Sequence, residues 1–324
     1  MSNRAKVRKK GRGIEGCSPF IPLFFRSMES DGMSFPRWLL KEMPSYTDFC
    51  RTGRAIGGLH TVCESAACPN IFECFGAKHL AFLILGKRCT RDCVFCAVAH
   101  GEPTHVDPQE AVRIAAAAVN LNLAHVVITS VTRDDLEDGG AFHYARTIKA
   151  LRQKTAVTIE VLIPDFGGDL QALEQVVEAG PDIMAHNVET VRRLQDCIRP
   201  QASYERSLQV LRSIKEIKGD MLLKSGLMLG LGEEDTEIMT AMQDIRETGC
   251  DILTLGQYRQ PGREQIAVQR FILEEGFAYL REKALAMGFR RVIAGSYVRS
   301  SYRAGEIKDL LRQKAGFPQD REEG

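Results

Sequence analysis

Residues 79–96, HLAFLILGKRCTRDCVFC, join a continuous apolar run to three closely spaced cysteines. The run from His79 to Gly86 shows no alternation of apolar and polar residues, which is typical of a short strand buried on both faces of a parallel sheet. Cys89, Cys93 and Cys96 follow it directly with the spacing C-x3-C-x2-C. We therefore expect the three thiols in the loop at the carboxyl end of this strand, where β/α proteins place functional groups.

A second group of three cysteines precedes the strand. Cys63, Cys68 and Cys74 have the spacing C-x4-C-x5-C. Three thiolates can hold three irons of a 4Fe-4S cluster and leave the fourth iron free for another ligand. Structural zinc usually takes four ligands from paired C-x2-C motifs, which the uneven spacing of both groups disfavours. For the earlier group taken alone, a cluster, a zinc ion and no metal all stay open; beside its neighbour, the cluster is favoured.

The composition excludes several classes of protein. The chain has 43 basic and 42 acidic residues, so it lacks the positive excess of a general nucleic-acid binder. It contains no apolar run of the length that crosses a membrane. Its 324 residues can bury a large core, so a framework of disulfides is not needed. Ten cysteines without a visible export signal predict a cytoplasmic protein that uses thiols as metal ligands.

Charge and motifs divide the chain into four parts. The expected parts are a disordered basic tail over 1–35, an N-terminal extension with the first triad over 36–78, a β/α barrel over 79–290 and a C-terminal extension over 291–324. A transit peptide, or a true start at Met28 or Met33, is an alternative for the tail. Cys17, Cys50, Cys197 and Cys250 have no triad spacing, and we expect no functional role for them.

Six apolar runs alternate with helical patterns and predict parallel β/α units. The runs are 79–86, 125–131, 157–164, 182–189, 221–229 and 251–258, and the helical patterns are 107–120, 140–153, 169–179, 204–218 and 235–248. An open doubly wound sheet and an incomplete barrel both fit six units. Polar residues at the strand ends, such as Glu160 and Lys224, favour an α/β fold of the incomplete (β/α)6 TIM-like type. Arg291–Val298 could form a seventh strand or an extension over the barrel mouth. Glu264–Met287 is expected to form one long helix, either continuous or interrupted near Glu275-Gly276.

The cysteine loop resembles that of the radical S-adenosylmethionine superfamily, because Phe95 precedes the last cysteine of C-x3-C-x2-C after the first strand. This resemblance implies that the free iron binds S-adenosylmethionine. It also implies that the turn Asp138-Gly139-Gly140 binds the methionine amino group through backbone carbonyls, and that Asn187 and Glu189 contact the ribose. Arg206 is a weaker candidate for the methionine carboxylate.

Two triads together with Arg299-Ser300-Ser301-Tyr302 resemble the lipoyl synthase family, over about Pro36 to Gly316. The resemblance implies two 4Fe-4S clusters per subunit, with Ser301 as the fourth protein ligand of an auxiliary cluster at Cys63, Cys68 and Cys74. A serine alkoxide is a harder iron ligand than thiolate and is more easily displaced. Arg299 would lie beside this cluster and control access to it.

The family's reaction would be the insertion of two sulfur atoms, at C6 and C8 of an octanoyl group on a lysine of a lipoyl carrier domain, to give lipoyl-lysine. The auxiliary cluster would supply the sulfur. Implied partners are octanoylated carrier domains (2-oxoacid dehydrogenase subunits and the glycine cleavage H protein), an iron–sulfur carrier protein and a low-potential electron donor, but no nucleic acid and no membrane. The alternatives are another sulfur-inserting enzyme of this superfamily, such as a methylthiotransferase, and a non-catalytic metal- or cluster-binding protein.

Overall fold

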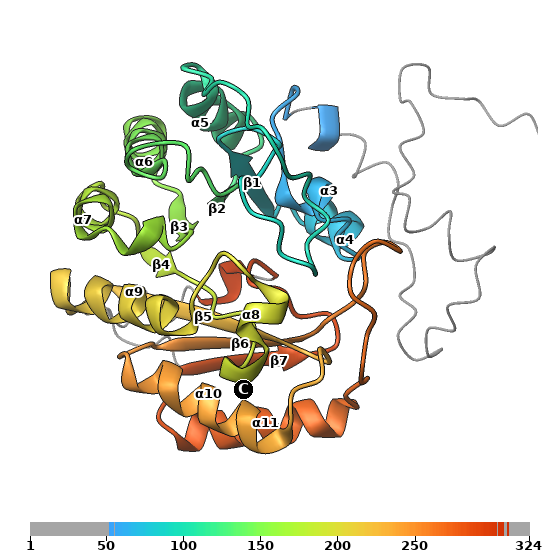
Figure 1. The fold of residues 1–324 in the computed structure, drawn as a ribbon. Coiled ribbons are helices and arrows are strands. Elements are labelled where there is room, and N and C mark those ends of the chain that lie inside the picture. Colours follow the sequence, from blue (N-terminus) through green and yellow to red (C-terminus); the bar gives the residue numbers. More distant parts are fainter. Residues whose placement is uncertain (1–51, 55, 303, 308–309, 311–324) are drawn as a thin grey trace, which may run out of the picture.

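The computed structural model describes residues 52–54, 56–302, 304–307 and 310, and its centre is one parallel sheet (Figure 1). The seven strands are β1 Leu80–Ile84, β2 His125–Ser130, β3 Thr158–Leu162, β4 Ile183–Ala185, β5 Leu222–Leu229, β6 Ile252–Gln257 and β7 Arg291–Gly295. They are paired in sequence order, each parallel to the next. Each of β1–β6 is therefore followed by a crossover to the next strand, so the carboxyl ends of all seven strands lie at the same end of the barrel.

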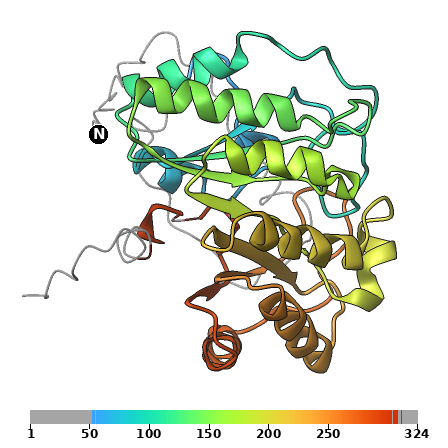
Figure 2. The ribbon, with the colours of Figure 1, turned by 90° about the vertical axis from the view of Figure 1, so that its left-hand side faces the viewer.

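Helices cover the outer face of the curved sheet (Figures 1 and 2). They are α5 Glu110–Asn120, α6 Ala141–Lys154, α7 Leu170–Glu178, α9 Tyr204–Ile217, α10 Asp235–Glu247 and α11 Glu274–Ala286. The short α8 Gln195–Ile198 precedes α9 and lies beside the cysteine loop instead, since the Val94 N–H donates to the Ile198 carbonyl at 3.1 Å. Side chains cap several of the outer helices: Asp169 caps α7, Ser203 caps α9, and Glu234 with Glu237 forms a capping box on α10. No helix in the described part of the chain is long and apolar enough to cross a membrane.

The predicted incomplete barrel is confirmed, with one strand more than the six expected. β7 pairs in parallel with β6 from Arg291 to Gly295, so the sheet continues past residue 290 and the alternative of a seventh strand is the correct one. β1 and β7 stand at the two ends of the strand order, and no pairing joins them among the described residues. The sheet therefore curves like a barrel wall but stays open on one side (Figure 1).

The long helix expected over Glu264–Met287 is wrong in its first half. The helix begins only at Glu274, and the residues before it are bound to the sheet instead. The buried amide of Gln257 accepts a hydrogen bond from the Ile272 N–H and donates one to the Arg270 carbonyl. Because these backbone groups are satisfied by a strand side chain, the segment does not need helical hydrogen bonds.

The N-terminal extension covers the free edge of β1. Thr61 forms an antiparallel bridge with Phe82, and the Leu83 N–H donates to the His60 carbonyl at 2.9 Å. The extension then forms α3 Val62–Ser65 and α4 Ile71–Gly76, which lie next to β1 in Figure 1. An exposed strand edge is thus paired, and the first triad is fixed against the barrel. The predicted basic tail over 1–35, with Cys17, and Cys50 lie outside the described residues.

Candidate active site

The second triad lies in a loop that closes on itself after β1. The Cys89 N–H donates to the Ala99 carbonyl at 2.8 Å, and the Gly101 N–H donates back to the Cys89 carbonyl at 3.0 Å. Two further backbone N–H groups, of Arg91 and Thr132, point at the Cys89 sulfur from 3.4 and 3.3 Å. The loop therefore presents two backbone donors to this sulfur, and such donors fix the orientation of a ligand atom.

A buried arginine inside the loop ties it to two neighbouring β/α connections. The Arg91 guanidinium forms bidentate pairs with Asp134, at 2.8 and 2.7 Å, and with Asp165, at 3.0 and 2.8 Å. Burial by itself raises the pKa of Asp165, but the paired Arg91 outweighs it and lowers that pKa to about 2. Arg206, the weaker carboxylate candidate, reaches Asp165 at 3.4 Å and thus belongs to this network. The pairs fix the orientation of the loop between Cys89 and Cys93.

Burial opposes the ionisation of three of the triad thiols, those of Cys63, Cys93 and Cys96. Burial raises the pKa of Cys63 and of Cys93, and it raises the pKa of Cys96 to about 12. For Cys93 the charge of Arg199 opposes this effect. A metal centre must therefore displace these protons before the sulfurs can act as ligands. All eight cysteines that the structure describes are free thiols.

The turn predicted after β2 has the conformation that requires glycine. Gly139 and Gly140 have φ values of +60° and +95°. A Cβ atom on Gly140 would lie 2.3 Å from Cδ1 of Leu85. The Asp138 carboxylate accepts the N–H groups of Gly140, at 2.9 Å, and of Phe142, at 2.6 Å. The turn thus caps α6 and is held at the mouth of the barrel, close to the residue that precedes the cysteine loop.

Asn187 and Glu189 extend β4 toward the chamber described below. Glu189 bridges to β5, since its N–H donates to the Gly226 carbonyl at 3.0 Å although its φ is +74°. The Asn187 amide donates to the Glu189 carboxylate at 3.0 Å and to the Ser300 hydroxyl at 2.5 Å. Burial raises the pKa of Glu189. A strained, buried carboxylate at a strand end is typical of a functional position.

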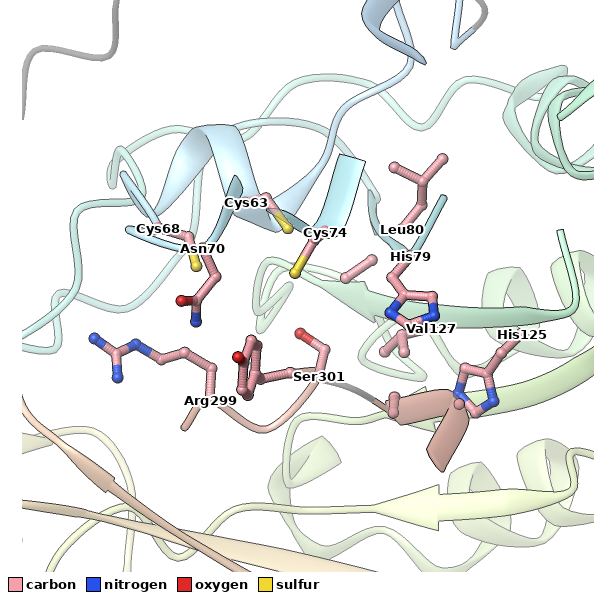
Figure 3. A pocket seen from close by; sticks show the side chains of 14 residues that line it. Cys63, Cys68, Asn70, Cys74, His79, Leu80, His125, Val127, Arg299 and Ser301 are labelled. Atoms are coloured by element: carbon pink, nitrogen blue, oxygen red, sulfur yellow. The ribbon is translucent and has the colours of Figure 1, made fainter. Parts of the chain in front are cut away.

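The first triad and the C-terminal motif line one cavity (Figure 3). Figure 3 shows Cys63, Cys68 and Cys74 on one side and Ser301 with Arg299 on the other. Two hydrogen bonds join these segments: the Asn70 amide donates to the Tyr297 carbonyl at 2.7 Å, and the Tyr302 hydroxyl donates to Glu73 at 3.0 Å. The predicted four-ligand set thus shares one cavity, across 227 residues of sequence between Asn70 and Tyr297.

The donor set of this cavity fits an iron–sulfur cluster. Its lining has three thiols and a serine hydroxyl, and thiolate is the usual ligand of such clusters. Within the described ranges, no three His, Cys, Asp or Glu side chains are grouped so that they could hold a single metal ion. A cluster spreads its ligands over several irons, whereas a zinc site gathers four ligands around one ion. The three thiols and the serine hydroxyl that line this cavity are thus a donor set that suits a cluster without a fourth cysteine.

A larger cavity of about 200 Å³ connects the two triads. It is lined by Cys63 and Cys68 from the first triad and by Cys96 from the second. Phe95, Asn187, Glu189, Arg299, Ser300 and Ser301 also line it. Most of the remaining wall is apolar, from residues such as Leu162, Leu227, Met228 and Val298. We call this cavity the chamber; it places groups from both triads around one space with room for an apolar chain.

Arg299 reaches the chamber on a segment that crosses β6 at close range. A Cβ atom on Gly256 would lie 2.2 Å from the Val298 carbonyl oxygen, so only glycine allows this crossing. Arg299 donates to the carbonyls of Gln257, at 3.1 Å, and Val298, at 2.7 Å. Burial lowers its pKa; the Cys68 thiol opposes this shift and the neighbouring Arg259 adds to it. Two arginines therefore give the chamber a positive wall beside the first triad.

Several polar residues behave differently from the sequence-based expectation. Glu160 and Lys224, expected at the mouth, pair with each other at 2.7 Å inside the barrel. Conversely, Arg91 and Arg259 belong to the site although neither was among the predicted site residues. The position of Arg91 between two cysteines was a usable signal, whereas nothing in the sequence around Arg259 distinguishes it from a solvated arginine.

Comparison with known proteins identifies the family. The model of the radical SAM superfamily matches residues 83–245. A lipoyl synthase of Symbiobacterium thermophilum is 48% identical over 289 residues, which cover 88% of this chain and 90% of that protein. A lipoyl synthase of Geotalea uraniireducens is 52% identical over 272 residues, which cover 83% and 95%. The chain belongs to the lipoyl synthase family.

Solved structures agree with the fold of this lipoyl synthase family member. Streptococcus suis SuiB bound to S-adenosylmethionine has a TM-score of 0.55 at 12% identity, and covers 69% of this chain and 56% of its own. HydG, a maturase of the [FeFe]-hydrogenase, has a TM-score of 0.51 at 14% identity, and covers 85% and 76%. At such identities the likeness concerns the fold alone. The family itself uses S-adenosylmethionine and a 4Fe-4S cluster.

Proposed function

We propose that this chain is a lipoyl synthase that inserts two sulfur atoms, at C6 and C8, into an octanoyl group on a lysine of a lipoyl carrier domain. The observation that carries the proposal is the chamber, because thiols of both triads and Ser301 line the same cavity of about 200 Å³. A reaction that takes hydrogen at one metal centre and sulfur from another needs both beside the same substrate carbon. The largely apolar wall suits an alkyl chain.

Each group of residues has a proposed role. Cys89, Cys93 and Cys96 would hold the cluster that binds S-adenosylmethionine, and Cys63, Cys68, Cys74 and Ser301 would hold a second, auxiliary cluster. When bound, the first supplies hydrogen abstraction through a 5′-deoxyadenosyl radical, and the second supplies the sulfur. The backbone of Asp138-Gly139-Gly140 would bind the methionine, while Asn187 and Glu189 would bind the ribose and Phe95 would form the wall beside the cysteine loop.

The chain's own residues would control the environment of this reaction. The apolar wall of the chamber excludes water, which protects a reactive carbon centre from side reactions. Arg299 and Arg259 line the chamber, where they would put positive charge beside an anionic auxiliary cluster and balance that charge in a buried site. Ser301 would be a harder ligand for iron than a thiolate, and a proton on its oxygen would let it leave as sulfur is consumed.

The substrate and the consumed cluster imply partners. The substrate would be an octanoylated lipoyl carrier domain, such as those of 2-oxoacid dehydrogenase subunits or the glycine cleavage H protein. Consumption of the auxiliary cluster requires an iron–sulfur carrier protein that replaces it, and reduction of the first cluster requires a low-potential electron donor. A cytoplasmic location stays a prediction.

The test is anaerobic reconstitution followed by reaction with S-adenosylmethionine, dithionite and an octanoyl-lysine peptide. Alanine at Cys89, Cys93 or Cys96 should abolish formation of 5′-deoxyadenosine, which liquid chromatography measures. Alanine at Cys63, Cys68 or Cys74 should leave part of that cleavage but stop sulfur insertion, which mass spectrometry measures. Wild-type protein that forms 5′-deoxyadenosine but never adds sulfur to the peptide would favour a methylthiotransferase, and equal loss of cleavage in both sets of folded variants would contradict the division of roles.

A further inference from the structure

The residue that precedes the cysteine loop has an unfavourable backbone conformation. Leu85 follows the last residue of β1 and has a φ of +68°, in the left-handed region that leucine rarely occupies. Its side chain is 1% exposed, so no exposed turn explains the conformation. Such a conformation persists only where the surroundings hold it, and it tends to occur at functional sites.

Two buried charged side chains hold the backbone of Leu85. The Glu110 carboxylate, at the start of α5, accepts the Leu85 N–H at 2.9 Å. The Arg133 guanidinium, in the connection after β2, donates to the Leu85 carbonyl at 3.1 Å. Glu110 and Arg133 are 5% and 3% exposed, and buried polar groups bind such partners more strongly than exposed ones do. Both backbone groups of one residue are therefore fixed by side chains from different elements.

These two side chains are themselves held in place. The same Glu110 oxygen forms a hydrogen bond with the His143 Nε2 at 2.8 Å, and His143 lies in the first turn of α6. Arg133 forms a bidentate pair with Asp135, at 2.8 Å for each bond. The backbone of Leu85 is thus joined to α5, to α6 and to the connection after β2. We call Leu85, Glu110, Arg133 and His143 the Leu85 clamp.

The side chain of Leu85 connects the clamp to the glycine turn. Its Cδ1 occupies the space in which a Cβ atom on Gly140 would lie, at 2.3 Å. Four residues further along the chain, Cys89 begins the triad. Leu85 therefore contacts the turn on one side and directs the cysteine loop on the other.

We propose that Glu110 and Arg133 are positioning residues that hold Leu85 in its left-handed conformation and so fix the cysteine loop relative to the Gly139-Gly140 turn. The inference rests on the proposed function, in which this loop holds the cluster and this turn binds the methionine of S-adenosylmethionine. S-adenosylmethionine would have to reach the cluster and the turn at the same time, because its methionine part would bind the free iron and the turn together. Loosening the clamp should therefore weaken binding of S-adenosylmethionine without removing any group that touches it.

The experiment measures binding of S-adenosylmethionine to the anaerobically reconstituted full chain, by equilibrium dialysis and by the change in the electron paramagnetic resonance spectrum of the reduced cluster. Glu110→Ala should bind about tenfold more weakly, which corresponds to about 1.4 kcal/mol. Its reduced cluster should also show a smaller spectral change at a fixed ligand concentration. Glu110→Gln keeps an oxygen that can accept the Leu85 N–H, so its affinity should stay within about twofold of the parent.

Asp251→Ala is a matched control, because Asp251 directly precedes β6 and so lies at the amino-terminal end of the strands, opposite the site. The Asp251 carboxylate also accepts a backbone N–H, of Leu223 at 3.0 Å, and a basic side chain, Lys215 at 2.8 Å. This variant should lose a similar amount of stability and keep its affinity. Every variant in the comparison must contain as much iron and sulfide as the parent protein, so that a weaker affinity does not reflect a missing cluster.

Three results would overturn the inference: parent-like affinity in Glu110→Ala, equal weakening in Asp251→Ala, or no recovery in Glu110→Gln. If Glu110→Ala does not fold, Leu85→Ala decides instead. It keeps the backbone partners and removes the side-chain contact with Gly140, together with part of the core packing around Leu85, so it should weaken binding similarly; unchanged binding would overturn the clamp. A parent protein whose reduced cluster never responds to S-adenosylmethionine would contradict the proposed function itself.

Discussion

At the scale of single residues, the site depends on two glycines that leave no room for a side chain and on one serine among the proposed cysteine ligands. Gly140 has no room for a methyl group beside Leu85, and Gly256 has none beside Val298. Ser301 places an oxygen among three sulfurs. Each of these small features makes a prediction that one substitution can test.

Gly140→Ala should weaken binding of S-adenosylmethionine at least tenfold. Its φ of +95° is unfavourable for alanine, and the new methyl group would press on Leu85. Equilibrium dialysis against the loaded protein gives the affinity. Gly180→Ala is the control, because Gly180 has a φ of +80° but open space around it, at a distance from the site. Similar losses of affinity in both variants would show that backbone strain alone, and not the contact with Leu85, causes the effect.

Ser301→Cys should retain the auxiliary cluster more firmly and insert sulfur at least tenfold more slowly. A thiolate is a softer ligand than an alkoxide and holds iron more tightly, so it leaves less readily. Iron retention after gel filtration and the rate of sulfur addition to an octanoyl-lysine peptide are the two measurements. Faster insertion in this variant would contradict a role for Ser301 as a ligand that must depart.

At the scale of elements, the sequence was informative wherever one element alone determined the pattern. The six apolar runs correspond to β1–β6, because strands buried on both faces must be apolar without alternation. The segment before α11 could not be predicted in this way. Its backbone is held by the side chain of Gln257 on β6, and the periodicity of the segment itself does not record such a partner. The site follows the same rule: the triads are local motifs, whereas the pairing of Arg91 with Asp165 is not.

The contact between the C-terminal motif and α4 is also non-local, and Tyr302→Phe tests it. The variant loses the hydrogen bond to Glu73, which costs about 1 kcal/mol of local stability. The segment that carries Ser301 should then exchange its amide hydrogens roughly five times faster, as mass spectrometry of the exchanged protein would show. Tyr204→Phe is the control, since Tyr204 donates to Asp244 on the outer helices at 2.9 Å. Faster exchange of the C-terminal segment in the control as well would contradict a local effect.

At the scale of the whole molecule, stability should depend on pH through His186. Burial, reinforced by the charge of Arg199, lowers the pKa of His186 to about 4, while the unfolded chain binds that proton below pH 6.5. Where the unfolded state binds more protons, the free energy of unfolding falls as the pH falls. His186 therefore removes stability as the pH decreases from about 6.5 toward 4.

His186→Asn should be less stable than the parent at pH 7.5, because the hydrogen bond to the Ile163 carbonyl is lost or weakened. The difference in the free energy of unfolding between the two proteins should shrink by about 1.4 kcal/mol at pH 5.5. Only the parent has a histidine that stays neutral when folded and is protonated when unfolded at that pH. Urea unfolding of both proteins at the two pH values measures this change. A difference that stays constant with pH would contradict the lowered pKa.

The hydrogen bond between Asn70 and Tyr297 connects residues 227 positions apart, which matters for the order in which the site is synthesised. At roughly 5–20 residues per second, a ribosome needs on the order of 10 to 50 seconds between these two points. During that time the first triad has left the ribosome, but Ser301 and the arginine beside it do not yet exist. The proposed auxiliary site can therefore be complete only after Ser301 has left the ribosome, so a cluster held by all four proposed ligands would have to be loaded after that point.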